Sequence, residues 1–305
     1  MIDDSIRSPH EHNFIRAGSE QRGLRRAGLM RLGTIATGAA TRAVVVEGES
    51  VVEVEGFRDV GELLRAGPAG MEAARRALAE GEASALDRAR LVRPVLAPAA
   101  IFCVGLNYRT HILEMKRELP AFPTLFAKLP RALTDPYAEI RLPAASEQVD
   151  YEAELAVVIG TGGRDVAAED AWDHVAGLTV LNDVTARDFQ RRTLQWFAGK
   201  TFQASTPMGP WIVTPDEVGD LSRREIVLTV NGEERQRSNL GDLVFDVPSL
   251  VADISRIVEL EPGDVIATGT PGGVGEASGR FLQAGDVVEV SIDGIGTIAN
   301  TFTRP

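Results

Sequence analysis

The sequence contains a single cysteine and four histidines among 305 residues. One cysteine, Cys103, excludes an internal disulfide and is typical of a protein kept in a reducing compartment. No apolar run approaches the roughly 20 residues of a membrane span, and the N-terminus lacks the apolar core of a signal peptide. These absences predict a soluble, cytoplasmic protein.

Positive charge is also scarce, because 32 Lys and Arg stand against 44 Asp and Glu, for a net charge of −12. Such a surface disfavours nucleic acid or an anionic membrane as a partner. It would also repel acidic substrates, so an anionic substrate needs a local positive pocket. Several enzyme motifs are missing as well: the sequence has no HExxH, no GxSxG, no Walker A loop and no cluster of Cys and His.

The patterns that are present predict an α+β fold dominated by strands. Residues 1–29 are polar and rich in Arg and Gly, which predicts a disordered tail with Met30 as the expected translation start. Residues 30–94 predict a small N-terminal domain. A segment rich in Pro and Ala at 93–98 marks the boundary to a main domain of residues 95–305.

Local periodicity predicts the elements of both parts. Helices are expected at 59–64, 71–80, 168–176 and 247–259. Strands are expected at 43–46, 51–54, 101–104, 124–128, 149–160, 178–182, 211–214, 226–231, 264–268 and 286–292. The dipeptide Asn231-Gly232 is a strong hairpin-turn signal.

Residues 149–160 carry the most informative pattern, Val-Asp-Tyr-Glu-Ala-Glu-Leu-Ala-Val-Val-Ile-Gly. Side chains alternate across a strand, so Asp150, Glu152 and Glu154 are predicted to share one face. A solvated face is the simpler explanation, but the acids lead into a buried-type apolar run, and Asp183 ends another apolar strand. Three carboxylates at the ends of neighbouring strands would offer oxygen ligands to Mg²⁺, Mn²⁺ or Ca²⁺.

A candidate base follows the strand that contains Cys103. His111 and Glu114 share one predicted helical face, where the carboxylate can orient the imidazole and raise its basicity. A surface pair is the simpler explanation of this spacing alone. The other histidines are poorer candidates, because His10 and His12 lie in the tail and His174 lies on a predicted exposed helix.

Other polar residues follow Asp183 along the chain. The guanidinium of Arg187 can donate two parallel hydrogen bonds to a carboxylate, and the ammonium of Lys200 can offer it a compact positive charge. A surface salt bridge is the simpler explanation of each residue alone. The Gly-rich run 268–275 can form an anion nest, to which Thr270 adds a hydroxyl, or a plain hairpin loop.

Together these residues resemble the fumarylacetoacetate hydrolase family over about residues 95–303. The resemblance rests on the order and spacing of Asn107-Tyr-x-x-His111-x-x-Glu114, Asp150-Tyr-Glu-Ala-Glu-Leu, Asn182-Asp-Val-Thr-Ala-Arg-Asp, Gly199-Lys-Thr-Phe, Pro207-x-Gly-Pro-Trp211 and Gly269-Thr-Pro-Gly-Gly-Val-Gly. It implies a mixed β-roll catalytic domain, a small N-terminal domain and usually a homodimer.

The resemblance also implies roles for individual residues. Glu152, Glu154 and Asp183 are expected to bind Mg²⁺ or Mn²⁺, and Ca²⁺ can occupy the same site. His111 and Glu114 match a catalytic dyad carried on a mobile lid, with Lys200 as the third catalytic residue. The expected substrate-binding residues are Tyr108, Lys128, Arg187, Gln190 and Thr270. Two departures from the family pattern, Leu129-Pro-Arg-Ala-Leu133 and Gln203, concern the far end of the substrate.

The chemistry implied is that of a metal-dependent enzyme acting on a small 2-oxo acid. In a 3-acylpyruvate, His111 would deprotonate water, the hydroxide would attack C4, and C3–C4 cleavage would release a carboxylic acid and pyruvate enolate. The sequence thus predicts a C–C bond hydrolase of the acylpyruvate or fumarylpyruvate type. Oxaloacetate decarboxylation and isomerisation of a 2-hydroxyhepta-2,4-dienedioate in aromatic catabolism are alternatives, since both use the same enolate. A non-catalytic metal-binding protein is a further alternative.

Overall fold

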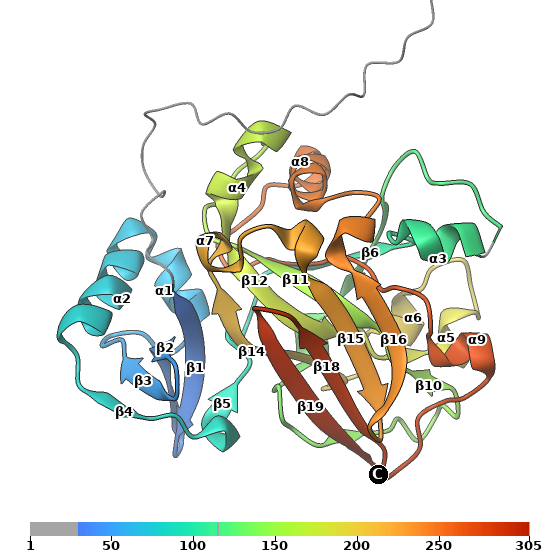
Figure 1. Cartoon of the computed structure of the whole chain (residues 1–305), viewed down its shortest axis with the longest axis horizontal. Helices are drawn as coiled ribbons and strands as arrows, with labels where there is room; N and C mark the ends of the chain where they lie inside the picture. The colour runs from blue at the N-terminus through green and yellow to red at the C-terminus, as the bar shows by residue number, and fades with distance from the viewer. Residues whose placement is uncertain (1–29, 115, 305) are drawn as a thin grey trace, which may run out of the picture.

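The chain folds mainly from strands, and the predicted α+β class is confirmed (Figure 1). The computed structural model describes residues 30–114 and 116–304, without the side chain of Glu114. The predicted tail, residues 1–29, lies outside the described residues, and its disorder stays a prediction. None of the helices within the described ranges is long and apolar enough to cross a membrane.

The smaller, N-terminal part of the chain lies on the left of Figure 1. Its elements are β1 (Arg31–Thr37), β2 (Ala40–Glu47), β3 (Ser50–Glu53), α1 (Val60–Arg65), α2 (Pro68–Glu80), β4 (Ala83–Ala85) and β5 (Leu91–Val92). β1 pairs antiparallel with β14 (Thr206–Val213) of the main part, with Leu32 opposite Ile212. Both side chains are fully buried in one hydrophobic cluster. The smaller part therefore extends the main sheet, and a domain boundary at residue 94 stays a prediction.

The main sheet continues from β14 towards the site. Its further strands, in spatial order, are β12 (Val175–Asn182), β11 (Ala153–Ile159), β17 (Val265–Ala267), β6 (Ile101–Gly105) and β7 (Thr124–Lys128), with β8 (Leu133–Thr134) beside β14. All residues of β11 are buried, which explains its apolar composition. β11 and β12 run antiparallel with Ala153 opposite Asn182. The residues just before β11 and just after β12 therefore meet at one end of the sheet.

A second sheet packs against the first. Its strands, in spatial order, are β16 (Glu233–Asn239), β15 (Glu225–Val230), β18 (Val287–Ile292), β19 (Gly296–Thr303) and β9 (Ile140–Arg141). Leu228 and Val290 of this sheet share a hydrophobic cluster with Leu155 of the main sheet. Asn231 and Gly232 join β15 to β16 with φ values of 52° and 78°. Positive φ at both positions is what a type I′ hairpin requires, so the predicted turn is confirmed.

The remaining helices and a two-stranded sheet complete the fold. They are α3 (Arg109–Glu114), α4 (Ala171–His174), α5 (Arg187–Gln190), α6 (Phe197–Lys200), α7 (Pro215–Val218), α8 (Val247–Ile257), α9 (Gly275–Ser278), β10 (Val149–Asp150) and β13 (Thr185–Ala186). α8 forms where predicted, and Asp246 caps it by accepting a hydrogen bond from Ser249 N at 2.9 Å. The predicted helix at 168–176 is shorter because Val175 already begins β12. α3, α5, α6 and α9 lie on the same side of the sheets (Figure 1).

Candidate active site

Three acidic side chains meet at the end of the main sheet where β11 begins and β12 ends. Glu152 precedes β11, Glu154 is its second residue, and Asp183 directly follows β12. One carboxylate oxygen from each lies within 4.8 Å of the others. Backbone hydrogen bonds hold the two chain segments together, because Asp183 N donates to Glu152 O at 2.9 Å. We call Glu152, Glu154 and Asp183 the acid cluster; the sequence predicted this grouping, and the structure brings the three side chains together.

Asp150 does not join the acid cluster, so the prediction of one continuous strand with three acids on a single face is wrong. The strand is interrupted after Asp150, which ends β10, and resumes at Ala153. The interruption breaks the alternation of side chains on which the prediction depended. The Asp150 carboxylate instead accepts hydrogen bonds from Gly275 N at 2.7 Å and from Glu276 N at 2.9 Å. It therefore ties the start of α9 to the acidic segment.

Two buried lysines neutralise part of the acid cluster. Lys200 Nζ lies 2.7 Å from Glu152 Oε2 and 2.7 Å from Asp183 Oδ2. Lys128 Nζ lies 2.6 Å from Asp183 Oδ1. Burial by itself would lower the pKa of Lys200, but attraction from Asp183 and Glu152 outweighs it and raises that pKa above its ordinary value. Lys200 therefore stays a cation.

Glu154 is the member of the acid cluster that the lysines leave uncompensated. It is buried and accepts a hydrogen bond from Gly269 N at 2.9 Å, and no described Lys or Arg forms an ion pair with it. Burial, and then repulsion from Asp183 and Glu152, raises the pKa of Glu154 well above its ordinary value. A buried carboxylate beside two others fits a bound cation, and oxygen ligands suit a hard divalent metal. The acid cluster is thus a candidate site for a divalent cation.

Arg187 joins the acid cluster to its surroundings. The first residue of α5, it donates from Nε to Asp150 Oδ2 at 2.8 Å and lies with Nη2 2.7 Å from Glu152 Oε1. Its Nη1 donates to Gln190 Oε1 at 3.0 Å. Because its donors are shared among these acceptors, Arg187 orients Glu152 and Gln190 as well as contributing positive charge.

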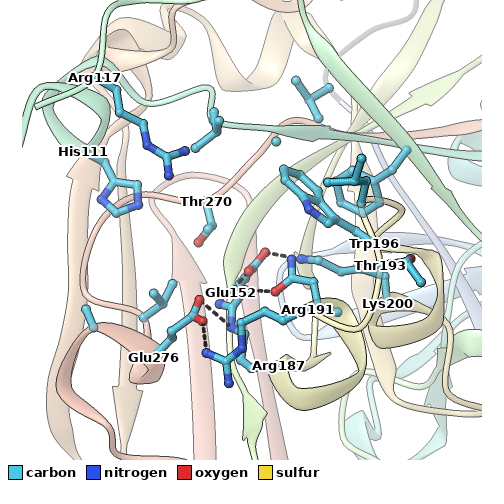
Figure 2. A pocket seen from close by; sticks show the side chains of 18 residues that line it. His111, Arg117, Glu152, Arg187, Arg191, Thr193, Trp196, Lys200, Thr270 and Glu276 are labelled. Carbon is cyan, nitrogen blue, oxygen red and sulfur yellow. Dashed lines mark hydrogen bonds and ion pairs between the residues drawn. The ribbon is translucent and has the colours of Figure 1, made fainter. Parts of the chain in front are cut away.

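A cavity of about 640 Å³ reaches the acid cluster at Glu152, the member of the cluster that lines it. Its lining includes Glu152, Lys200, Arg187, Gln190, Thr270 and His111. Figure 2 shows His111 across the cavity from Glu152 and Lys200, with Trp196 on a further wall. The structure thus places most of the predicted site residues around one space, on segments that are far apart in the sequence.

Several predicted site residues do not line the cavity. Glu154 and Asp183 are buried within the acid cluster. Lys128 and Tyr108 are fully buried and are not among the residues that line the cavity. Lys128 lies behind Asp183, and the hydroxyl of Tyr108 has no hydrogen-bond partner in the described part of the chain. α3 ends at Glu114, whose side chain lies outside the described residues. Roles for Lys128, Tyr108 and Glu114 stay predictions, as do those of the acid cluster.

Gln236, which the sequence did not suggest, supports the site through Thr270. It is buried on β16, where its Oε1 accepts a hydrogen bond from Ala153 N at 2.9 Å. Its Nε2 donates to Thr270 Oγ1 and to Pro271 O, each at 2.9 Å. Gln236 therefore fixes the Gly-rich loop against the first residue of β11.

α3, which carries His111, is anchored at its start by the loop before α8. Asn107 Nδ2 donates to Thr268 O at 2.8 Å, and Asn107 Oδ1 accepts from Phe245 N at 2.8 Å. Asp242 accepts hydrogen bonds from Thr110 N and Thr110 Oγ1, each at 3.0 Å. Asp242 thus acts as an N-cap supplied by a distant segment. These contacts set the position of the wall that holds His111.

Comparisons with known proteins agree with the geometry. The profile of the fumarylacetoacetate (FAA) hydrolase C-terminal domain matches residues 100–303. The mitochondrial oxaloacetate tautomerase FAHD2A of Bos taurus is 42% identical over 264 residues, which cover 83% of this chain and 84% of that protein. Fumarylacetoacetate hydrolase from Exiguobacterium antarcticum superposes with a TM-score of 0.82 at 37% identity, covering 90% of this chain and 100% of that chain. Maleylpyruvate hydrolase from Sphingobium sp. SYK-6, solved with manganese(II) and pyruvate, superposes with a TM-score of 0.75 at 32% identity, covering 90% and 99%.

Proposed function

Because the chain belongs to the fumarylacetoacetate hydrolase family, we propose that it is a divalent-cation-dependent enzyme that interconverts the enol and keto forms of oxaloacetate. The observation that carries this proposal is the acid cluster, with Lys200 beside it, reached through Glu152 from a cavity whose walls carry arginine and histidine. The choice of reaction is supported by the Bos taurus tautomerase. Mg²⁺ or Mn²⁺ is the proposed cation, and the maleylpyruvate hydrolase neighbour binds manganese.

The chemistry follows from the charges around the cavity. A divalent cation held by the acid cluster would supply a Lewis acid for the carboxylate and 2-oxo oxygens of the substrate. Lys200 stays charged, so its ammonium can stabilise the negative charge that develops on the 2-oxygen when C3 loses a proton. His111 lines the cavity on the facing wall and would move the proton at C3. Reprotonation at C3 or at the 2-oxygen then gives the keto or the enol form.

Hydrolysis of an acylpyruvate, the reaction that the sequence motifs predict, is the second candidate. The maleylpyruvate hydrolase neighbour with bound pyruvate favours it, as does the place of His111 in the cavity. In this reaction His111 would take a proton from water, and the water oxygen would attack C4 of the substrate. Decarboxylation of oxaloacetate and isomerisation of a dienedioate need the same enolate without the attacking water, and they stay alternatives.

One experiment separates these reactions. Crystalline enol oxaloacetate is dissolved with the purified protein, and the decay of enol absorbance is followed with Mg²⁺, with Mn²⁺ and with EDTA. Release of pyruvate is measured in parallel from oxaloacetate and from a panel of acylpyruvates. We expect metal-dependent acceleration of enol decay without matching release of pyruvate. Decay at the buffer rate, together with pyruvate release from an acylpyruvate, would replace tautomerisation by hydrolysis.

Two further predictions concern the cellular form of the protein. A homodimer stays a prediction, and sedimentation at several protein concentrations tests it. A cytoplasmic location also stays a prediction, which cell fractionation tests.

A further inference from the structure

We infer that Arg117 binds the second carboxylate of a 2-oxo dicarboxylate and so makes the enzyme selective for diacids over monoacids. This inference rests on the proposed function and deepens it, because it places the 2-oxo end of the substrate at the acid cluster. Arg117 is the residue that would recognise the second carboxylate, at the other end of the substrate. None of the motifs in the sequence pointed to Arg117.

Arg117 differs from the other cations of the cavity in its partners. Lys200 and Arg187 are bonded to the acid cluster, as described above. Arg191 lies with Nη1 2.6 Å from Glu276 Oε1. Among the side chains that the structure describes, which exclude those of Glu114 and Met115, no carboxylate lies within ion-pair distance of Arg117, and Arg117 lines the same cavity. Its guanidinium thus faces the cavity without an ion-pair partner among those side chains.

The end of α3 fixes the direction of Arg117. Lys116 adopts a left-handed conformation with φ of 56°. Its N–H donates to Leu113 O at 2.9 Å, while Arg117 N donates to Ile112 O at 3.2 Å. This pair of hydrogen bonds is the Schellman pattern that ends many helices, usually with Gly in the left-handed position. Ile112 is buried, so the turn is anchored in the core.

The turn directs Arg117 into the cavity. Figure 2 shows Arg117 beside His111, with its guanidinium pointing from the α3 wall towards Thr270. Glu152 of the acid cluster and Lys200 lie beyond Thr270 from Arg117 in the same view, and both line the cavity. A ligand whose 2-oxo end lies at the acid cluster would extend its far end towards Arg117.

Charge explains why a diacid would be preferred. The chain carries a net charge of −12, so a dianion needs positive partners inside the cavity at both of its ends. A guanidinium can bind a carboxylate through two parallel hydrogen bonds, and charged hydrogen bonds of this kind are stronger than neutral ones. A monoanionic 2-oxo acid of the same length has no group for Arg117. Arg117 should therefore increase the binding affinity for diacids and leave the affinity for monoacids unchanged.

The test uses ligand pairs that differ only in the second carboxylate. Calorimetry measures binding of 2-oxoglutarate and 2-oxopentanoate, and of 2-oxoadipate and 2-oxohexanoate, to the Mn²⁺-loaded full chain. The wild type should bind the diacid of at least one pair about tenfold or more tightly than the monoacid. Arg117→Gln should reduce this ratio about tenfold and leave monoacid affinity within about twofold.

Arg191→Gln is the matched control, because it also removes one positive charge from the cavity but takes it from a residue already paired with Glu276. Arg191→Gln should change the ratio of diacid to monoacid affinity by no more than about twofold from wild type. A change of this size is expected from a screened, partly exposed charge. Equal loss of diacid and monoacid binding in Arg117→Gln would overturn the inference, as would loss of the ratio in Arg191→Gln alone. Arg117 is exposed, so unchanged melting temperature is expected for its variant.

The outcome is distinguishable from failure of the proposed function, since binding does not depend on turnover. Diacid preference that depends on Arg117 would support the inference even if enol oxaloacetate decays at the buffer rate. Normal tautomerase activity with no diacid preference would overturn the inference and leave the proposed function standing. If neither acid of any pair binds the Mn²⁺-loaded protein, the inference falls, and the enol oxaloacetate assay alone decides the proposed function.

Discussion

The base of the cavity and its α3 wall are built in different ways. The acid cluster lies on the main sheet, its side chains are buried, and Lys200, Lys128 and Arg187 are bonded to it. The α3 wall is a helix of six residues, and Arg117 at its end is exposed. Tertiary hydrogen bonds from Asn107 and Asp242 hold this wall.

The difference separates two tasks. Charges that stabilise a transition state work best when they are held fixed and away from water, which the buried base provides. Groups that exchange protons, or that bind the variable end of a substrate, have to be accessible to solvent and ligand, and the exposed α3 wall provides this access. We therefore expect changes at the base to affect stability and metal binding together, and changes at the wall to affect turnover or ligand choice alone.

The largest effect is expected at the base. Asp183→Asn should abolish Mn²⁺ binding and turnover, because it removes a predicted ligand and leaves Lys128 and Lys200 with less compensation. Breaking a buried ion pair costs about 3–5 kcal/mol of unfolding free energy. Urea denaturation and calorimetry with Mn²⁺ measure both effects. Normal Mn²⁺ affinity with an unchanged unfolding midpoint would show that Asp183 has neither role.

At the α3 wall we expect a large effect on turnover without an effect on metal binding by the acid cluster. His111→Ala should reduce kcat for acylpyruvate hydrolysis and for tautomerisation by about 10²–10⁴, the usual cost of losing a positioned base. Metal-dependent decarboxylation of oxaloacetate should suffer less, since it needs no base, and Mn²⁺ affinity should be unchanged. His174→Ala, outside the cavity lining, is the control. Hydrolysis within a factor of a few of wild type would exclude His111 as the base.

A smaller effect distinguishes the members of the acid cluster from one another. Glu154→Gln should abolish Mn²⁺ binding, yet it should stabilise the metal-free protein at neutral pH, because burial and repulsion from Asp183 and Glu152 raise the pKa of Glu154 and so penalise its charged form. The sign is opposite to that expected for Asp183→Asn, whose carboxylate is paired with two lysines. Thermal unfolding in EDTA compares the two variants. A lower melting temperature for Glu154→Gln in EDTA would mean that Glu154 is already compensated without a metal.

The smallest effect is expected at the anchor of the wall. Thr110→Val removes the exposed hydroxyl that donates to Asp242, while Thr110 N keeps its hydrogen bond to the same carboxylate. kcat/KM should fall a few-fold through displacement of His111, while Mn²⁺ affinity and the unfolding midpoint stay close to wild type. Steady-state kinetics and calorimetry on the same preparation check this. A loss of Mn²⁺ affinity would show that the wall and the base are not independent.

The same contrast explains which parts of the site the sequence could predict. Glu152 and Glu154 stand out because charged residues rarely lead into a buried strand, and Asp183 stands out at the end of another. Asp150 looked the same locally, but a break in the strand turns it towards α9, and the pattern of single residues does not record that break.

Residues that depend on tertiary contacts could not be predicted from their neighbours in the chain. Gln236 lies among the charged residues of β16, in no motif that the sequence offered, and folding buries it against Thr270. Arg117 is one of many arginines, and only the turn at Lys116 directs it into the cavity. The helix α8 and the Asn231-Gly232 turn were predictable because their signals are local. The N-cap of α8 directly precedes the helix, and the turn depends on two adjacent residues.

The pairing of β1 with β14 has a consequence for how the protein is made. Met30 N donates to Thr214 Oγ1 across a sequence separation of 184 residues. During synthesis, β1 leaves the ribosome long before β14 has been made. The edge of β1 that pairs with β14 in the folded protein is therefore unpaired during this time. Pairings this distant slow folding, and a waiting strand edge is open to association with other chains. We therefore expect a late step in which the earliest described strand closes the sheet, and a need for protection until β14 has been synthesised.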